Sequence, residues 1–288
     1  MPLSLTSILP GRFRKRRPIV AVVRLAGIIG SLGPLRRGLS LAGLSGALER
    51  AFKLKGARAV ALSINSPGGS PVQSSLIAGR VRALAEQHHL PVLAFVEDVA
   101  ASGGYWLATA ADEIYADASS VVGSIGVVSA GFGFQEALGR LGIERRVHTA
   151  GDYKAGLDPF RPERAEDVAH LKSLQAEIHE AFRAQVRNRR QGRLAAAEDE
   201  LFNGRFWTGA TALRLGLVDG LGDIRSVLRE RFGDDVKLRV VGDSRRWRPW
   251  RMGTPGIAGD EVSGHAERLA GGLIAAVEER MLWNRFGL

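Results

Sequence analysis

The feature that most constrains the fold of this 288-residue chain is an alternation of short apolar segments with helical segments. Residues 19–23, 58–64 and 91–96 are rich in Val, Ile and Ala and are typical of buried strands. Between them, residues 41–53 and 71–88 repeat apolar side chains at helical spacing. Strands that alternate with helices predict an α/β fold with a mainly parallel sheet and flanking helices.

The alternation continues with shorter elements after residue 100 and ends near residue 242. In order, we expect a helix over 102–111, a strand over 113–116, a helix over 134–141, a strand over 144–149, a helix over 164–190, helices over 208–215 and 224–232, and a strand over 236–241. We find no internal repeat among these segments. Residues 18–242 are therefore predicted to form one domain.

Two segments outside this predicted domain have a different character. Residues 1–17 form a basic leader, which we expect to be flexible, and residues 243–288 form a cationic Arg/Trp linker followed by an amphipathic helix over 261–286. Both segments can attract an anionic membrane surface, whereas nucleic acid is the less favoured partner. Two alternatives are equally compatible with the pattern. The leader can simply be solvated, and the terminal helix can pack on the protein body or on a neighbouring subunit.

Composition excludes several classes of chemistry and of location. The absence of cysteine excludes disulfides, thiol nucleophiles and Cys-ligated metal centres, and no His spacing indicates a metal, so we expect neither metal nor cofactor. The longest uncharged stretch, residues 118–135, contains eight Gly or Ser, and the apolar run 19–23 ends at Arg24. We therefore expect no membrane-spanning helix and no signal peptide, and a cytoplasmic protein with peripheral membrane attachment open to either end.

Adjacent glycines follow the second predicted strand, in the segment NSPGG at residues 65–69. Gly68 and Gly69 at the junction of a strand and a helix can direct bare N–H groups into a cleft. This is the geometry of an oxyanion hole, which stabilises the negative charge that develops during acyl transfer. The pentapeptide alone leaves a plain strand-to-helix turn open as the alternative.

A second candidate segment is ASGGYW at residues 101–106. Ser102 is predicted at a helix N-terminus, where the helix dipole favours developing negative charge. The glycines beside it would let a substrate backbone reach the hydroxyl group. Taken alone, Ser102 can instead be a helix-capping residue, which is the commoner role of serine at this position.

A nucleophilic serine needs a base, and none of the six histidines lies in a recognisable triad motif, so surface or structural roles are favoured for all of them. Lys154 is the remaining candidate, because it lies in a glycine-flanked loop away from the basic clusters. A lysine of ordinary pKa, about 10.4, is protonated at neutral pH, so a lysine base has to be buried among apolar groups and away from carboxylates. A surface lysine is the alternative reading.

Five segments taken together make the sequence familiar: INSPGG (64–69), ASGGYW (101–106), VVGSIGVV (121–128), GDYKAGLDPFRPE (151–163) and GRFWTGATALRLGLVDGLG (204–222). With these segments in this order, the chain resembles the signal peptide peptidase A family of Ser/Lys proteases. That family belongs to the ClpP/crotonase superfamily, so the resemblance implies a ClpP/crotonase-like fold. Five ordered segments are far more specific than any one of them.

The resemblance also implies roles for individual residues. The six site residues are the nucleophile Ser102, the general base Lys154, the lysine-orienting Ser124, and the oxyanion-hole residues Gly68, Gly69 and Gly103. In this family the serine and the lysine of one site come from two copies of the domain. Because this chain holds one copy, the resemblance implies a homo-oligomeric ring of about eight subunits, with Lys154 of one protomer meeting Ser102 of its neighbour. Within one chain the two side chains should then lie far apart.

We therefore expect a serine endopeptidase that hydrolyses peptides or small proteins through an acyl-enzyme. Many members of the family begin with a membrane anchor and act on signal peptides, whereas this chain begins with a basic leader, so the substrate is left open. One alternative is a non-catalytic lipid- or nucleic-acid-binding protein on a protease-like fold. The least favoured alternative is a crotonase-type acyl-CoA enzyme, because such enzymes usually place Glu or Asp where this chain has Ser102.

Overall fold

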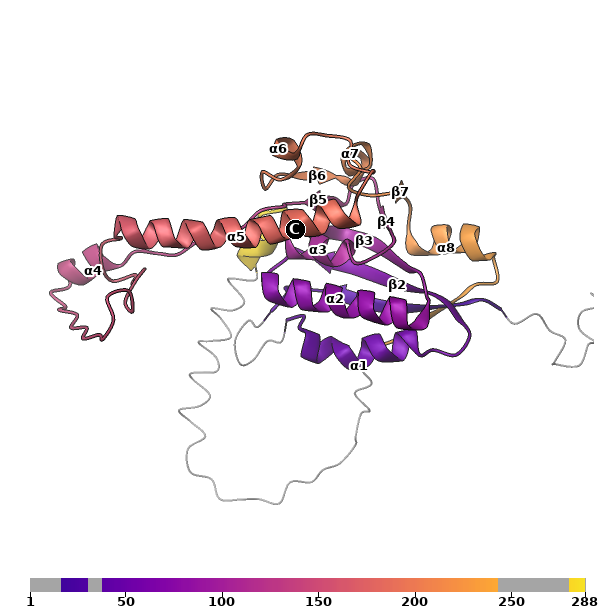
Figure 1. Ribbon diagram of the computed structural model, residues 1–288, viewed down its shortest axis with the longest axis horizontal. Coiled ribbons are helices and arrows are strands. Elements are labelled where there is room, and N and C mark those ends of the chain that lie inside the picture. The colour runs from indigo at the N-terminus through magenta and orange to yellow at the C-terminus, as the bar shows by residue number, and fades with distance from the viewer. Residues whose placement is uncertain (1–16, 31–37, 243–279, 288) are drawn as a thin grey trace, which may run out of the picture.

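The computed structural model describes residues 17–30, 38–242 and 280–287, and a parallel β-sheet forms its centre (Figure 1). The strands are β1 (Ile19–Ala26), β2 (Ala57–Ser66), β3 (Val92–Ala101), β4 (Glu113–Ala116), β5 (Val121–Gly123), β6 (Phe206–Thr208), β7 (Gly220–Leu221) and β8 (Lys237–Val240). Their order across the sheet is β6-β5-β3-β2-β1-β8, while β4 pairs with β3 and with β7. Every pairing among these strands is parallel except that of β5 with β6. The predicted α/β fold with a mainly parallel sheet is confirmed.

The helices alternate with the strands as expected. They are α1 (Leu41–Phe52), α2 (Pro71–His88), α3 (Gly103–Ala108), α4 (Gln135–Arg140), α5 (Ala165–Arg189), α6 (Glu198–Leu201), α7 (Gly209–Arg214) and α8 (Ile224–Phe232). The bounds of α2 and α8 coincide with the sequence prediction, because both helices have clear capping signals. The short elements β5, α6, β6 and β7 were not predicted, since two to four residues carry no measurable periodicity.

The two faces of the sheet are covered by different helices. Alternate residues of β1 point to opposite faces, so Val23 joins the core under α1 and α2 whereas Val22 joins the core under α8. On the first face, Leu48 of α1 and Ile77 of α2 are fully buried. On the second face, Leu228 of α8 is the buried contact. The sheet is therefore a layer between helices, as parallel sheets require.

The start of α2 fixes the loop that carries the glycine pair. Ser70 caps this helix by accepting a hydrogen bond from the Gln73 amide at 3.3 Å, and Pro71 occupies the first helical turn. Proline suits this place because its missing N–H would have no partner there. The helix therefore begins at Pro71, so its cap Ser70 directly follows Gly69 and fixes the end of the glycine turn.

A long projection leaves the compact body of the protein. We call residues 129–164 together with the first half of α5 the arm, and everything packed around the sheet the body. Figure 1 shows α4 and the first half of α5 extending away from the sheet. None of residues 129–166 is buried, whereas Phe182 and Val186 in the second half of α5 are buried against the body.

The strand expected over 144–149 is absent, and this prediction was wrong. Residues 144–149 lie in the arm and form no regular structure. An apolar or β-branched run becomes a strand only where another strand offers backbone hydrogen bonds, and the arm places this segment away from the sheet. Tertiary placement therefore overrode the local pattern.

Several sequence predictions fall outside the described residues. The leader up to residue 16, the Arg/Trp linker and most of the predicted helix over 261–286 lie outside them. The last part of that helix lies inside, and residues 280–284 are helical. Within the part of the chain that the structure describes, no helix combines the length and apolar character needed to cross a membrane.

Candidate active site

Ser102 occupies the sharp turn between β3 and α3. Its φ is +51°, its amide donates to the Gly123 carbonyl at 2.8 Å, and its carbonyl accepts from the Trp106 amide at 3.0 Å. The Ser102 hydroxyl makes no capping hydrogen bond to α3. The capping role that the sequence left open is therefore not the one this side chain performs. A positive φ at a non-glycine residue is uncommon and concentrates at functional sites.

Glycines let the backbone of the 66–69 turn approach Ser102 closely. A Cβ added to Gly68 would lie 2.9 Å from the Ser102 Cβ and 2.9 Å from the Ala101 carbonyl oxygen. A Cβ added to Gly104 would lie 2.4 Å from the Ser66 carbonyl oxygen. All three distances are too short for a side chain, so the loop after β2 contacts the Ser102 turn only because these positions are glycine.

The glycine loop also presents backbone N–H groups beside Ser102. The Gly68 amide donates to the Ser66 hydroxyl at 3.2 Å, and its carbonyl accepts from Ile29 at 2.8 Å. Within the described residues, the amides of Gly69 and Gly103 have no acceptor. The Gly69 nitrogen lies 3.4 Å from the position of a Cβ on Gly103, so the two groups are neighbours. Of the three residues predicted for the oxyanion hole, Gly69 and Gly103 keep their N–H groups available.

Ser124 lies next to Ser102 in space. It has a φ of +53°, is 3% exposed, and its amide donates to the Arg205 carbonyl at 2.7 Å. Ser102 and Ser124 line one cavity of about 300 Å³. The rest of its wall is formed by residues 126–128, His179 of α5, residues 202–204 and Arg285. The structure thus brings together five of the six predicted site residues: Gly68, Gly69, Ser102, Gly103 and Ser124.

Lys154 does not join them within one chain. It is exposed in the arm, near the start of α5, where Asp167 lies close to Gly156. Asp167 lies at the arm, whereas Phe182 lies at the body, where its ring stacks on Trp106 of α3 at 4.8 Å. These two residues of α5 are 15 positions apart, which is about 22 Å along a helix. The separation of Lys154 from Ser102 within the chain agrees with the expectation stated above for a single copy.

The carboxylates near Lys154 on the sequence are engaged elsewhere or exposed. Asp158 pairs with Arg145 and with Arg161, and its pKa is lowered below the ordinary value, chiefly by a hydrogen bond from the Phe160 amide. Asp158 therefore stays ionised and bound inside the arm. A carboxylate so occupied does not hold the Lys154 ammonium as an ion-pair partner.

A histidine that sequence reasoning assigned to a surface or structural role lies beside the site. The Nε2 atom of His179 is 3.2 Å from the carbonyl oxygen of Ile125, the residue after Ser124. His179 is 77 positions from Ser102, and no local motif connects them. The available signal was its spacing on α5, because His179, Phe182, Val186 and Arg190 form one stripe at intervals of three and four residues.

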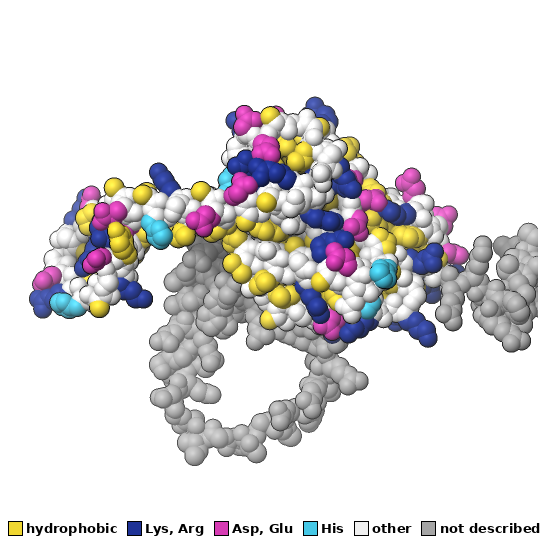
Figure 2. All heavy atoms as spheres, in the orientation of Figure 1, with side chains coloured by type: hydrophobic (Ala, Val, Ile, Leu, Met, Phe, Trp, Pro, Cys, Tyr) yellow, Lys and Arg dark blue, Asp and Glu magenta, His cyan; other side chains and the backbone are white. Residues whose placement is uncertain are grey.

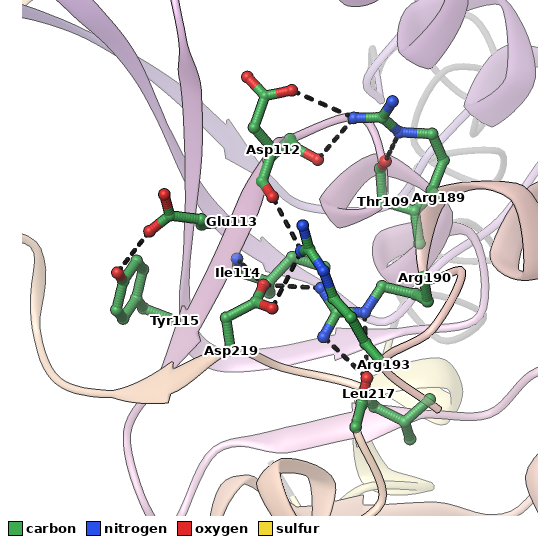
Figure 3. A network of polar contacts seen from close by, with 12 residues as sticks. Thr109, Asp112, Glu113, Ile114, Tyr115, Arg189, Arg190, Arg193, Leu217 and Asp219 are labelled. Carbon is green, nitrogen blue, oxygen red and sulfur yellow. Dashed lines mark hydrogen bonds and ion pairs between the residues drawn. The ribbon is translucent and has the colours of Figure 1, made fainter. Parts of the chain in front are cut away.

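A polar network anchors the end of α5 to the body (Figure 3). Arg190 is 1% exposed, and its guanidinium donates twice to the Gly216 carbonyl and once to Asp219 at 2.6 Å. The neighbouring Arg189 donates to the Thr109 carbonyl at 2.9 Å, just after α3. These bonds hold the second half of α5 against α3, the helix that begins directly after the nucleophile candidate Ser102.

Tyr105 extends this anchoring to the interior of α3. Its hydroxyl donates to the Leu217 carbonyl at 2.7 Å, and burial raises the pKa of the Tyr105 phenol far above its ordinary value. The residue is fully buried, so its hydroxyl is a structural donor and not an acid. The helix that begins after Ser102 is thereby fixed to the segment that precedes β7.

A larger cavity of about 540 Å³ has a separate lining. Its lining includes Ser63, Glu97 and Asp223 and none of the six predicted site residues. Among the residues that the structure describes, no group of three His, Asp or Glu side chains is arranged to hold a metal ion.

Comparisons with known proteins place the chain in a family. The model of peptidase family S49 matches residues 85–237, which include Ser102, Ser124 and Lys154. The chain is 33% identical over 216 residues to the chloroplastic serine protease SPPA of Arabidopsis thaliana, covering 72% of this chain and 31% of that protein. It is 53% identical over 293 residues to a Brucella abortus protein named Na⁺/H⁺ antiporter NhaA, covering all of this chain and 39% of that protein.

The chain thus spans less than half the length of these relatives. A solved structure of the membrane-bound stomatin-specific protease 1510-N, in complex with a substrate peptide, superposes with a TM-score of 0.50 at 16% identity. That likeness covers 80% of this chain and 94% of the other, and it shows a shared ClpP/crotonase-like fold. The matched family model and the fold agree with the resemblance seen in the five sequence segments, and the chain belongs to peptidase family S49.

Proposed function

We propose that this chain is a serine endopeptidase in which Ser102 is the nucleophile and Lys154 is the general base. The observation that carries the proposal is the setting of Ser102, on a turn of positive φ with a hydroxyl that does not cap its own helix. The unpaired amides of Gly69 and Gly103 lie beside it. A nucleophile next to two unused N–H donors is the arrangement that acyl transfer requires.

The reaction follows from these groups. The Ser102 oxygen attacks the scissile carbonyl carbon while its proton passes to a neutral lysine amine. The negative charge that develops on the carbonyl oxygen is stabilised by the Gly69 and Gly103 amides. The lysine then gives the proton to the leaving amine, which departs and leaves an acyl group on Ser102. Water attacks this ester with the lysine again acting as base, and the free serine is restored.

The lysine base comes from a neighbouring copy in this proposal. Lys154 sits in the exposed arm, and the arm carries exposed aromatic side chains that a second copy would cover. An arm docked on the neighbouring body would bring Lys154 to the cavity that holds Ser102 and Ser124, where the Ser124 hydroxyl would orient the amine. Burial of the lysine by the interface would favour its neutral, basic form.

The substrate class in this proposal is an extended peptide or small protein, including signal peptides released from a membrane. A peptide substrate is supported by the structural neighbour, the 1510-N protease, which was solved in complex with a substrate peptide. A cytoplasmic location with peripheral membrane contact, expected from the sequence, belongs to the same proposal.

Two active-site substitutions and their mixture test the mechanism and the shared site together. Ser102→Ala and Lys154→Ala should each lower kcat/KM for a peptide substrate by at least about 10³-fold, because each removes a group that acts in the chemical step. A serine-reactive acylating probe should label Ser102 in the wild type. Equal amounts of the two inactive chains, reassembled together, should recover about a quarter of wild-type activity if the partners of each site come from different copies.

Lys55→Ala is the matched control, because Lys55 is an exposed lysine of the body and lies outside the arm. It should retain wild-type activity. Wild-type activity in Ser102→Ala or in Lys154→Ala would refute the proposed chemistry. A mixture that reassembles and stays inactive, while the wild type is active, would refute the shared site alone.

A further inference from the structure

One stripe of α5 faces the body and leads to the cavity. Phe182, Val186 and Arg190 on this stripe are buried against the body. His179 is the next member of the stripe toward the arm, and it is half-buried in the wall of the cavity that holds Ser102. It is the last residue of this stripe before α5 leaves the body, so it lies at the junction of the two regions.

The contact that His179 makes is specific. Its Nε2 lies 3.2 Å from the Ile125 carbonyl oxygen, and a carbonyl oxygen can only accept. The Nε2 atom therefore carries the hydrogen and donates it. The same oxygen accepts from the Gly204 amide at 3.1 Å, so two donors from distant segments hold the carbonyl of Ile125.

The segment that His179 contacts needs external support. Ser124 has a φ of +53°, a conformation that costs free energy for any residue with a Cβ. Four hydrogen bonds help to hold the segment. The Ser102 amide donates to the Gly123 carbonyl, and the Ser124 amide donates to the Arg205 carbonyl. The other two are the bonds that the Ile125 carbonyl accepts. Of these, the bond from His179 is the one made by a side chain, and it is the one that comes from α5.

We propose that His179 is a positioning residue, which holds the 123–126 segment so that Ser124 stays oriented toward the reacting centre at Ser102. This inference rests on the proposed function above and names a residue that serves the same site. His179 touches neither substrate nor reacting atoms in this role. It acts through the Ile125 carbonyl and ties the geometry of the site to the helix that carries the arm.

The test compares two substitutions at His179 that differ in one property. His179→Gln keeps an N–H donor at nearly the same reach from the helix, whereas His179→Leu keeps bulk and removes the donor. His179→Leu should lower kcat by about tenfold with KM changed less than about threefold, the scale of one lost hydrogen bond. His179→Gln should stay within about threefold of wild-type kcat. Asn188→Leu, which removes an exposed N–H donor from the second half of the same helix, is the matched control and should be unchanged.

A second readout works without catalysis. Hydrogen exchange of the amides of residues 124–127 should speed up by about tenfold in His179→Leu, because the segment loses one of its supports. It should stay within about twofold of wild type in His179→Gln. A merely structural role for the imidazole, filling space beside the cavity, predicts that Leu is tolerated at least as well as Gln by both measures.

The outcomes separate this inference from the proposed function. Unchanged kcat and unchanged exchange in His179→Leu, or equal losses in the Leu and Gln variants, would overturn the positioning role. An inactive wild type in which Ser102 is not labelled would overturn the proposed function. In that event the exchange experiment would still decide whether His179 holds the 123–126 segment.

Discussion

Apolar side chains are buried in the body of this protein and exposed to solvent in its arm. In the body, strand residues such as Leu62 are fully excluded from solvent between two layers of helices. In the arm, Phe132 and Leu141 are each 72% exposed, and none of residues 129–166 is buried. Figure 2 shows hydrophobic side chains on the outer surface of this projection. The same chain thus contains a completed core and an uncovered apolar surface.

The arm has a local order of its own despite this exposure. Phe134 contacts the rings of Phe132 and Phe160 at 6.2 and 5.6 Å, and the Arg145 guanidinium lies 4.6 Å from the Phe160 ring centre. Contiguous apolar surface on a projecting segment is typical of a protein interface. The body buries its apolar side chains within the chain, and we propose that the apolar surface of the arm is covered by a second copy.

The largest stability effect is expected at the anchor between the two regions. Arg190→Met should lower the free energy of unfolding by about 4 kcal/mol, because it leaves the Gly216 carbonyl without its donors and removes the buried ion-pair partner of Asp219, which keeps its more exposed partner Arg193. Urea denaturation followed by circular dichroism measures this loss. Arg214→Met, an exposed arginine on α7, is the control and should change the free energy by less than about 0.5 kcal/mol. Equal effects of the two substitutions would show that the anchor contributes nothing.

The next effect contrasts equivalent truncations in the two regions. Leu62→Ala removes a fully buried side chain and should cost about 3 kcal/mol, through lost burial and a cavity. Leu141→Ala removes a side chain that is mostly exposed and should cost less than about 0.5 kcal/mol when measured on the dilute single chain. A large cost for Leu141→Ala at low protein concentration would mean that the arm is supported within the chain, and the contrast drawn above would fail.

An arm substitution should act on assembly and activity instead of on the stability of the body. Phe132→Asp places a charge on the exposed aromatic cluster and should shift the protein toward smaller species in analytical ultracentrifugation. Peptidase activity should fall by about tenfold, because fewer sites would receive a lysine from a neighbour. Val240→Asp makes the same kind of change at a residue of the body that is 64% exposed, and it should leave both properties unchanged. Loss of activity without any change in assembly would argue against the shared site.

The smallest effect is a pH dependence at the junction of α5 with α6. Hydrogen bonds from Arg187 and Arg183 lower the pKa of Glu198 to about 2. Because this pKa lies below the ordinary value of 4.5, the contribution of Glu198 to stability is complete above pH 4.5 and is lost as the pH falls toward 2. Glu198→Gln should therefore lower Tm at pH 7 by no more than about 2 °C, and the difference should shrink at pH 3.

Glu177→Gln removes an exposed carboxylate from the same helix and serves as the reference for this measurement. Its Tm should follow that of the wild type at both pH values. A Glu198→Gln difference that grows as the pH falls would contradict the sign of the predicted dependence.

Most of the fold of the body was predictable from sequence, because its elements are long enough to show their periodicity. The bounds of α2 and α8 match the prediction. The strands β1, β2 and β3 lie where strands were predicted, and each continues a few residues beyond its predicted C-terminal end. The expected strand over 144–149 failed, because a strand needs a neighbour that periodicity does not supply. The short strands β5, β6 and β7 were missed, since their existence depends on the strands beside them.

The candidate site was predictable wherever its residues lie in glycine-rich motifs. Ser102, Gly69 and Gly103 converge because glycines shape the two turns, and those glycines are visible in the sequence. His179 was not predicted as a site residue, because its place beside Ser124 depends on how α5 lies across the body. A contact between a helix and a loop that are distant in sequence leaves no local pattern.

The sequence by itself determined the alternation that makes the sheet, the glycines that let two turns meet, and membership of peptidase family S49. Only the tertiary structure decided which side chains share a cavity. It placed His179 with Ser102 and Ser124, and it carried Lys154 away in the arm. The reason is physical, because local propensities act over a few residues, whereas the packing of α5 on the body is set by buried contacts such as that of Phe182 with Trp106.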